Sequence, residues 1–158
     1  MLAGMQPIQR KIQVSVRDQQ LRLLHGVEIE AVFPISTSRF GVGSEAGSYR
    51  TPLGTFRIAE RIGDGAPEGT IFQSRVPSGQ WEPGMITPED LVLTRILWLD
   101  GLEEGNANTR DRYIYIHGTN DEDSIGKPAS CGCVRMRNAD VVALFDRVAE
   151  GTEVEIVV

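Results

Sequence analysis

The 158-residue sequence contains few of the residues that build covalent or metal frameworks: two cysteines and two histidines. Cys131 and Cys133 are separated by one residue, so they do not make a disulfide framework, and a direct bridge between them would be strained. No run of about 18 apolar residues occurs, which excludes a membrane-spanning helix. Residues 1–11 lack the apolar centre of a secretory signal. We therefore expect a short N-terminal extension without a leader, which leaves a cytoplasmic location open.

Positive charge is also scarce, with 16 Lys and Arg against 22 Asp and Glu and a net charge of −6. All of the positive residues except Lys11 and Lys127 are arginines, and they are scattered. This balance argues against a nucleic-acid partner, which favours clustered basic residues. Each arginine other than Arg135 is interpreted as part of a solvated face. The hydrophobic fraction of 41% fits one globular domain over residues 1–158.

Hydrophobic periodicity predicts a mainly β fold with one principal helix near the C-terminus. Alternation of apolar and polar residues predicts strands at 12–16, 20–24, 26–36, 55–59, 95–99, 112–117 and 152–158. Residues 63–84 are rich in glycine and proline, and we expect them to form a long surface loop. Asn138 is the expected N-cap of the helix, whose apolar residues recur from Val141 to Val148, and Gly151 is its expected stop.

One cysteine and one histidine occur in segments that favour a catalytic site: YIYIHGTN at 113–120 and SCGCVRM at 130–136. A free thiol has a pKa of about 8.5, so a nucleophilic Cys133 needs a partner such as His117, at the end of a predicted strand. Arg135 lies two residues on, on the same side of a strand, where its charge would lower the thiol pKa. Gly132 permits a turn whose amides point at a developing oxyanion.

Other interpretations remain open for these residues. Cys133 could be a buried small hydrophobe and His117 a core histidine bonded to the backbone. Cys131, Cys133 and His117 are possible zinc ligands, but a fourth ligand is missing and the C-x-C spacing is unusual for zinc. His25 is expected at the surface, and residues 121–123 (DED) are expected to form a solvated loop. No P-loop and no G-x-G-x-x-G fingerprint occurs.

The combined segments resemble the signature of bacterial L,D-transpeptidases, cysteine enzymes that cross-link peptidoglycan. The similarity rests on HGTN at 117–120 and IGKPASCGCVRM at 125–136, with further similar segments at 35–37, 51–56, 138–140 and 151–154. It extends from about residue 12 to residue 158. The sequence departs from the family at Cys131, where the family often has histidine, and this places a second thiol beside Cys133.

The resemblance implies an L,D-transpeptidase-like β-sandwich in which Cys133 is the nucleophile and His117 the general base and acid. The carbonyl of Gly118 would orient the imidazole and complete a triad. The resemblance also implies that no metal or organic cofactor is needed.

Three further residues receive roles from the same resemblance. The amides of Gly132 and Cys133 would form the oxyanion hole, Arg135 would act near the acyl centre, and Ser130 would help shape the turn.

The implied reaction is acyl transfer on peptidoglycan stem tetrapeptides. A thioester forms on Cys133, D-alanine leaves, and an amine of a second stem takes the acyl group; residues 63–84 would control access of this acceptor. Two alternatives stay open: hydrolysis of the same bond by an L,D-carboxypeptidase or thiol amidase, and a non-catalytic peptidoglycan-binding or metal-binding module. The resemblance implies a periplasmic or cell-envelope location, and the oligomeric state is not predicted.

Overall fold

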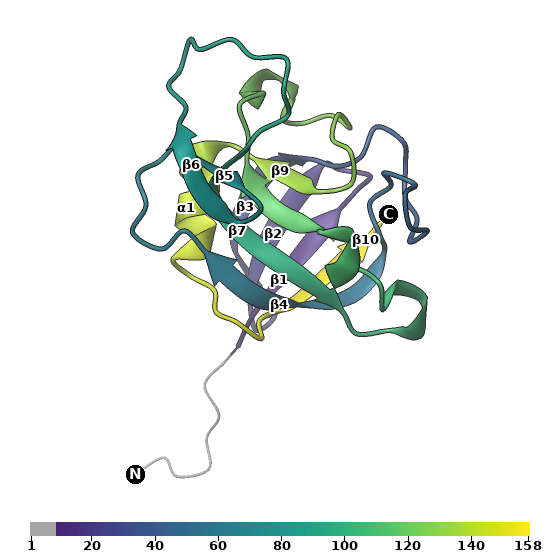
Figure 1. Cartoon of the computed structure of the whole chain (residues 1–158). Helices are drawn as coiled ribbons and strands as arrows, with labels where there is room; N and C mark the ends of the chain where they lie inside the picture. Colours follow the sequence, from purple (N-terminus) through teal and green to yellow (C-terminus); the bar gives the residue numbers. More distant parts are fainter. Residues whose placement is uncertain (1–8) are drawn as a thin grey trace, which may run out of the picture.

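The computed structural model describes residues 9–158 (Figure 1). The expected extension 1–11 lies mostly outside the described residues, and its last residues, Arg10 and Lys11, begin the first strand. The strands are β1 (Arg10–Ser15), β2 (Gln20–His25), β3 (Glu28–Ser36), β4 (Gly54–Ile62), β5 (Thr70–Gln73), β6 (Val76–Gln80), β7 (Val92–Gly101), β8 (Tyr115–Gly118), β9 (Val134–Met136) and β10 (Glu153–Val157). Short 3-10 turns occur at η1 (Glu104–Asn106), η2 (Arg110–Arg112) and η3 (Glu122–Ser124), and the helix is α1 (Asn138–Phe145).

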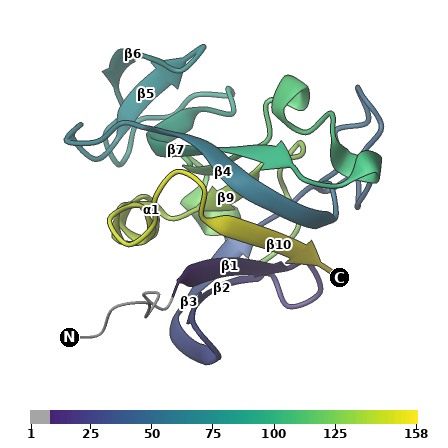
Figure 2. The same cartoon turned by 90° about the horizontal axis from the view of Figure 1, so that it is seen from below.

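Eight of the strands form one closed sheet. Their order is β4-β10-β1-β2-β3-β9-β8-β7, and β4 also pairs with β7, so the sheet returns to its starting strand (Figure 2). The pairs β1–β10 and β8–β9 are parallel, and the other pairs are antiparallel. Strands β5 and β6 extend the sheet from β7. The predicted mainly β sandwich with a helix near the C-terminus is therefore confirmed.

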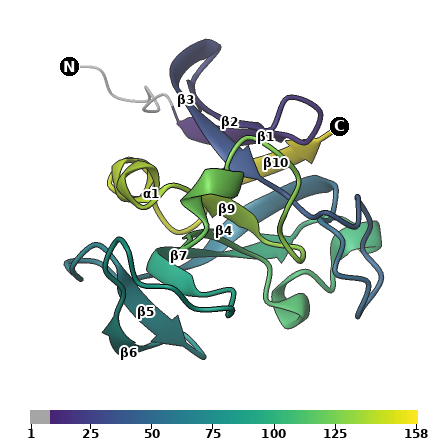
Figure 3. The ribbon, with the colours of Figure 1, turned by 90° about the horizontal axis from the view of Figure 1, so that it is seen from above.

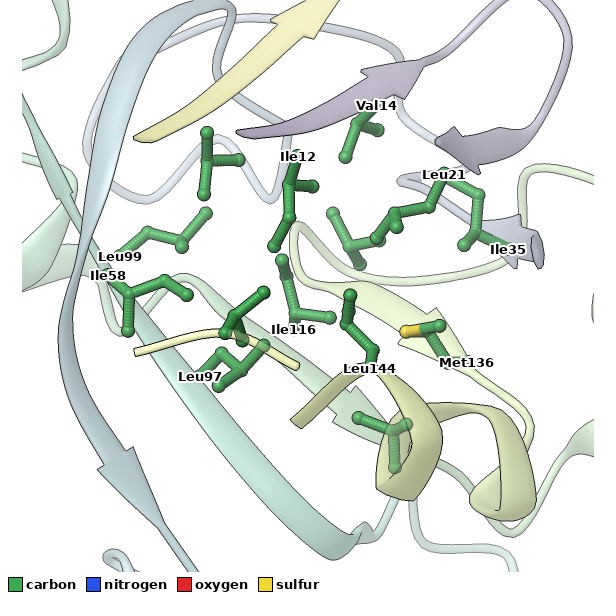
Figure 4. Close-up of a cluster of buried hydrophobic side chains, with 14 of the residues drawn as sticks. Ile12, Val14, Leu21, Ile35, Ile58, Leu97, Leu99, Ile116, Met136 and Leu144 are labelled. Atoms are coloured by element: carbon green, nitrogen blue, oxygen red, sulfur yellow. The ribbon is translucent and has the colours of Figure 1, made fainter. Parts of the chain in front are cut away.

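The core lies inside this closed sheet, because buried and exposed side chains alternate along its strands as the sequence predicts. Ile12 and Val14 of β1 are fully buried, and α1 adds Leu144 and Phe145 to the same cluster. Figure 4 shows Leu144 on the helix close to Ile116 of β8. Burial of each such side chain contributes roughly 1.5–3 kcal/mol. Within the described part of the chain, no helix is long and apolar enough to cross a membrane.

Outside the helix, strands β4 and β7 are longer than predicted, and two other segments also differ from the prediction. Residues 63–84 are not a structureless loop, because they contain the hairpin β5–β6. Strand β8 begins at Tyr115 rather than near residue 112, because Tyr113 adopts the left-handed conformation with φ 56°.

The helix also begins and ends differently from the expectation. Arg137, not Asn138, occupies the N-cap position. The buried Asn138 side chain instead accepts a hydrogen bond from Thr94 Oγ1 (2.6 Å) and donates one to the carbonyl of Thr119 (2.9 Å). The helix ends at Phe145, and Gly151 lies in the later turn before β10.

Candidate active site

Cys133 lies directly before β9, beside the start of β8. Its Sγ accepts a hydrogen bond from the backbone N–H of Tyr115 (3.3 Å) and donates one to the carbonyl of Tyr113 (3.4 Å). The side chain is half-buried against a small cluster that includes Phe72 and Ile96. The thiol is therefore neither fully enclosed nor freely exposed.

The turn that carries Cys133 is held from both sides. Gly132 has φ 124°, a conformation that strongly favours glycine, and its carbonyl accepts a hydrogen bond from Thr51 Oγ1 (3.0 Å). Ser130 Oγ donates to the carbonyl of Cys133 (2.6 Å) and accepts from the N–H of Gly132 (3.3 Å). The N–H of Gly132, one of the two amides expected in the oxyanion hole, thus already donates a hydrogen bond to Ser130.

His117 lies in β8 and is buried. In the parallel pairing of β8 and β9 it stands opposite Arg135, and in the pairing with β7 it stands opposite Ile96, whose cluster also holds the Cys133 side chain. Its Nδ1 is 2.5 Å from the carbonyl oxygen of Gly118. A carbonyl only accepts, so Nδ1 carries the proton and Nε2 is left as an acceptor. Neither hydrogen bond of the Cys133 thiol reaches the imidazole.

Arg135 is buried, and its charge is balanced by two carboxylates. Its guanidinium is 2.6 Å from Asp90 Oδ2 and 3.6 Å from Asp121 Oδ2. Glu122 also has a partner, since it accepts a hydrogen bond from the N–H of Asn138 (3.0 Å). Asp121 and Asp123 are exposed, as expected of a solvated loop, whereas Glu122 is partly buried.

Burial sets the charge state of both reactive groups. Burial raises the pKa of Cys133 to about 11, although the N–H of Tyr115 and the charge of Arg135 oppose the shift. Burial likewise lowers the pKa of His117 below its ordinary value, against the opposing effect of the Gly118 carbonyl. Arg135 lowers the thiol pKa as expected, but burial outweighs this effect and Asp90 acts in the opposite direction. The thiol and the imidazole are therefore both uncharged near pH 7.

The exposed Cys131 contributes to the lining of two clefts. One has a volume of about 390 Å³, and its lining includes Asp90, Asn120 and Arg135. The other has a volume of about 200 Å³, and its lining includes Tyr49. Figure 3 shows β9 near the middle of the molecule and the hairpin β5–β6 projecting beyond β7.

A third cavity, of about 470 Å³, lies beside the C-terminal end of α1 and contains none of the candidate residues. Across residues 9–158, no group of three His, Cys, Asp or Glu side chains lies close enough together to hold a metal ion. His25 is exposed, as expected.

Sequence reasoning missed three residues that support this site: Thr51, Asp90 and Asn120. Thr51 belongs to a segment that contributes to the resemblance, but it received no role, and its contact with Gly132 spans 81 residues. Asp90 lies 45 residues from Arg135 in an irregular segment, so no periodicity identifies it. Asn120 directly follows the HGT segment at 117–119, and this position was the one signal in the sequence that could have identified it.

Comparisons with known proteins identify the family of this chain. The family model described as YkuD, L,D-transpeptidase catalytic domain, matches residues 9–156. YqjB of Bacillus subtilis, whose name assigns it to the L,D-transpeptidases, is 52% identical over 142 residues, covering 89% of this chain and 67% of that protein. YkuD of Bacillus subtilis, similarly named, is 56% identical over 41 residues, covering 26% of this chain and 25% of that protein.

A solved structure gives independent support for the fold. The L,D-transpeptidase of Xylanimonas cellulosilytica (residues 123–326) superposes with a TM-score of 0.61 at 20% identity, over 98% of this chain and 63% of that one. The chain thus spans about two thirds or less of each of these relatives. The match of the family model over nearly all of the described residues shows that this chain belongs to the L,D-transpeptidase catalytic domain family.

Proposed function

We propose that the chain is a single catalytic domain that transfers acyl groups of peptidoglycan stem tetrapeptides through a thioester on Cys133. The observation that carries the proposal is that the neutral His117 imidazole belongs to a residue opposite Ile96, in whose cluster the Cys133 side chain also packs. Membership of the family supplies the substrate class, and we place the activity in the cell envelope, where peptidoglycan lies.

In the first step, the thiol turns from the carbonyl of Tyr113 toward His117 and attacks the carbonyl carbon of the third stem residue. Because the thiol pKa is raised, Nε2 of His117 takes the proton as the S–C bond forms. The N–H of Tyr115, already directed at Sγ, steadies the sulfur as it gains charge. The tetrahedral intermediate then expels D-alanine, whose amine receives the proton from the imidazolium.

In the second step, an amine of another stem attacks the thioester. His117 takes a proton from the amine, the new amide forms, and the thiol of Cys133 is regenerated. The two clefts that Cys131 helps to line favour transfer, because they offer separate places for donor and acceptor beside the turn that carries Cys133. Attack by water instead gives the carboxypeptidase reaction.

The test uses purified tetrapeptide monomers and mass spectrometry. The wild-type protein is expected to release D-alanine and form a cross-linked dimer, and Cys133→Ala is expected to do neither. Cys131→Ser is the matched thiol control and should still release D-alanine. Release of D-alanine by Cys133→Ala, or no product from the wild type, would overturn the proposal, whereas tripeptide without dimer would assign the carboxypeptidase reaction.

A further inference from the structure

The segment between β6 and β7 borders the site but has few connections to the rest of the molecule. Residues 83–91 form no helix or strand and are mostly exposed (Figure 1). In the part of the chain that the structure describes, the hydrogen bonds and ion pairs joining this segment to other segments come from Asn120 and Arg135. Its position therefore depends on those two residues.

Asn120 binds the backbone on both sides of Asp90. Its Nδ2 donates to the carbonyl of Glu89 (3.0 Å), and its Oδ1 accepts from the N–H of Leu91 (3.0 Å). A primary amide is suited to this task, because it presents a donor and an acceptor together. An aspartate in the same place would lose the donor.

Asp90, held in this way, reaches the buried Arg135. The ion pair is short (2.6 Å), and the arginine side chain is only 6% exposed whereas that of Asp90 is 43% exposed. Arg135 stands opposite His117 in the pairing of β8 and β9. A continuous set of contacts thus runs from Asn120 through Asp90 to the residue beside the imidazole.

We propose that Asn120 is a positioning residue for the acyl transfer proposed above, on which this inference rests: its amide holds Asp90 against Arg135, and this contact fixes the guanidinium beside His117. Asn120 itself touches neither the thiol nor the imidazole. Its effect reaches them through Asp90 and Arg135.

Displacement of Asp90 changes the pKa of the Cys133 thiol, and this change can be measured without substrate. Asp90 raises the pKa of both Cys133 and His117, and Arg135 lowers both. The other groups whose charges interact with the Cys133 thiol are Cys131 in the same turn, Arg112 in η2 and Tyr115 in β8. Asp121, on the segment after β8, acts through its pair with Arg135. Release of Asp90 therefore removes a negative charge that favours the protonated thiol.

The experiment compares Asn120→Ala, Asp90→Asn and the double variant in a Cys131→Ser background. The rate of Cys133 alkylation by iodoacetamide is measured against pH, and kcat/KM is measured with tetrapeptide monomers. Asp90→Asn should move the alkylation midpoint to lower pH, and Asn120→Ala should move it in the same direction. Each single variant should lower kcat/KM by about 10- to 100-fold, as expected for a misplaced site, and the double variant should be no worse than the more impaired single one.

Gln80→Ala is the matched control, since its amide also binds a backbone carbonyl, that of Glu68 (2.6 Å), but touches neither Asp90 nor Arg135. Asn120→Asp, which keeps only the acceptor, guards against a folding defect in the alanine variant and should shift kcat/KM in the same direction. An unchanged midpoint in Asn120→Ala beside a shifted one in Asp90→Asn would overturn the inference, as would additive losses in the double variant. Alkylation needs no peptide, so its outcome is separate from that of the Cys133→Ala test of function.

Discussion

The backbone N–H of Tyr115 donates to the Sγ of Cys133 at 3.3 Å, which joins the candidate nucleophile to the strand that carries His117. The sulfur is thus held by a neighbouring strand as well as by its own turn. The thiol also donates a hydrogen bond to the carbonyl of Tyr113, so the sulfur is protonated in the resting protein. Activation therefore requires a change of hydrogen-bond partner, not the displacement of a strand.

The first prediction concerns the resting thiol. Burial raises the pKa of Cys133 to about 11, so alkylation by iodoacetamide should be slow at pH 7 and should keep accelerating above pH 9. The measurement is the rate of Cys133 modification against pH in Cys131→Ser, which removes the exposed competing thiol. A rate that reaches its plateau below pH 9 would contradict this prediction.

The second prediction concerns the general base. Burial lowers the pKa of His117, so the imidazole should be neutral throughout the neutral range, and the acidic limb of kcat/KM should fall below pH 6.5. Activity is lost as pH falls through the His117 pKa, because protonation removes the acceptor on Nε2. His117→Gln should lower kcat by about 100- to 10,000-fold. An acidic limb above pH 6.5, or near wild-type activity in His117→Gln, would show that another group acts as the base.

The third prediction concerns Gly118. A Cβ at this position would clash with Asn138 Oδ1 and would lie 2.8 Å from the carbonyl oxygen of Leu93. Gly118→Ala should therefore lower the free energy of unfolding by roughly 1–3 kcal/mol, measured by urea denaturation. Gly105→Ala is the control, because nothing lies within 4 Å of its Cβ, and it should stay within about 1 kcal/mol of wild type. Equal stabilities for the two variants would show that the backbone at residue 118 shifts enough to accommodate the added Cβ.

The fourth prediction concerns the buried Thr51, whose hydroxyl accepts from the N–H of Ser38 (3.0 Å) and donates to the carbonyl of Gly132 (3.0 Å). Thr51→Val leaves both backbone groups without this partner, which should cost roughly 1–3 kcal/mol of unfolding free energy. Thr51→Ser keeps the hydroxyl and should lose less stability and less kcat/KM. A valine variant as stable and active as the serine variant would show that the hydroxyl does not hold the turn.

Much of the fold follows from local pattern. The alternation of Ile12 and Val14 predicts a strand with one buried face, because successive side chains point to opposite faces. The β5–β6 hairpin was missed because Val76–Gln80 is entirely exposed and contains proline and glycine. The left-handed Tyr113 was missed for a similar reason, since its aromatic and apolar neighbours favour a continuous strand.

The sequence by itself determined the element types, the segments that carry Cys133 and His117, and the family to which they are similar, because these depend on residue type and short spacing. Only the tertiary structure decided that β4 meets β7, that Asp90 neutralises Arg135, and that burial outweighs the arginine in setting the thiol pKa. Each of these three results depends on groups that are far apart in the sequence. Desolvation in particular depends on every atom that replaces water around a group, and no local pattern records that set.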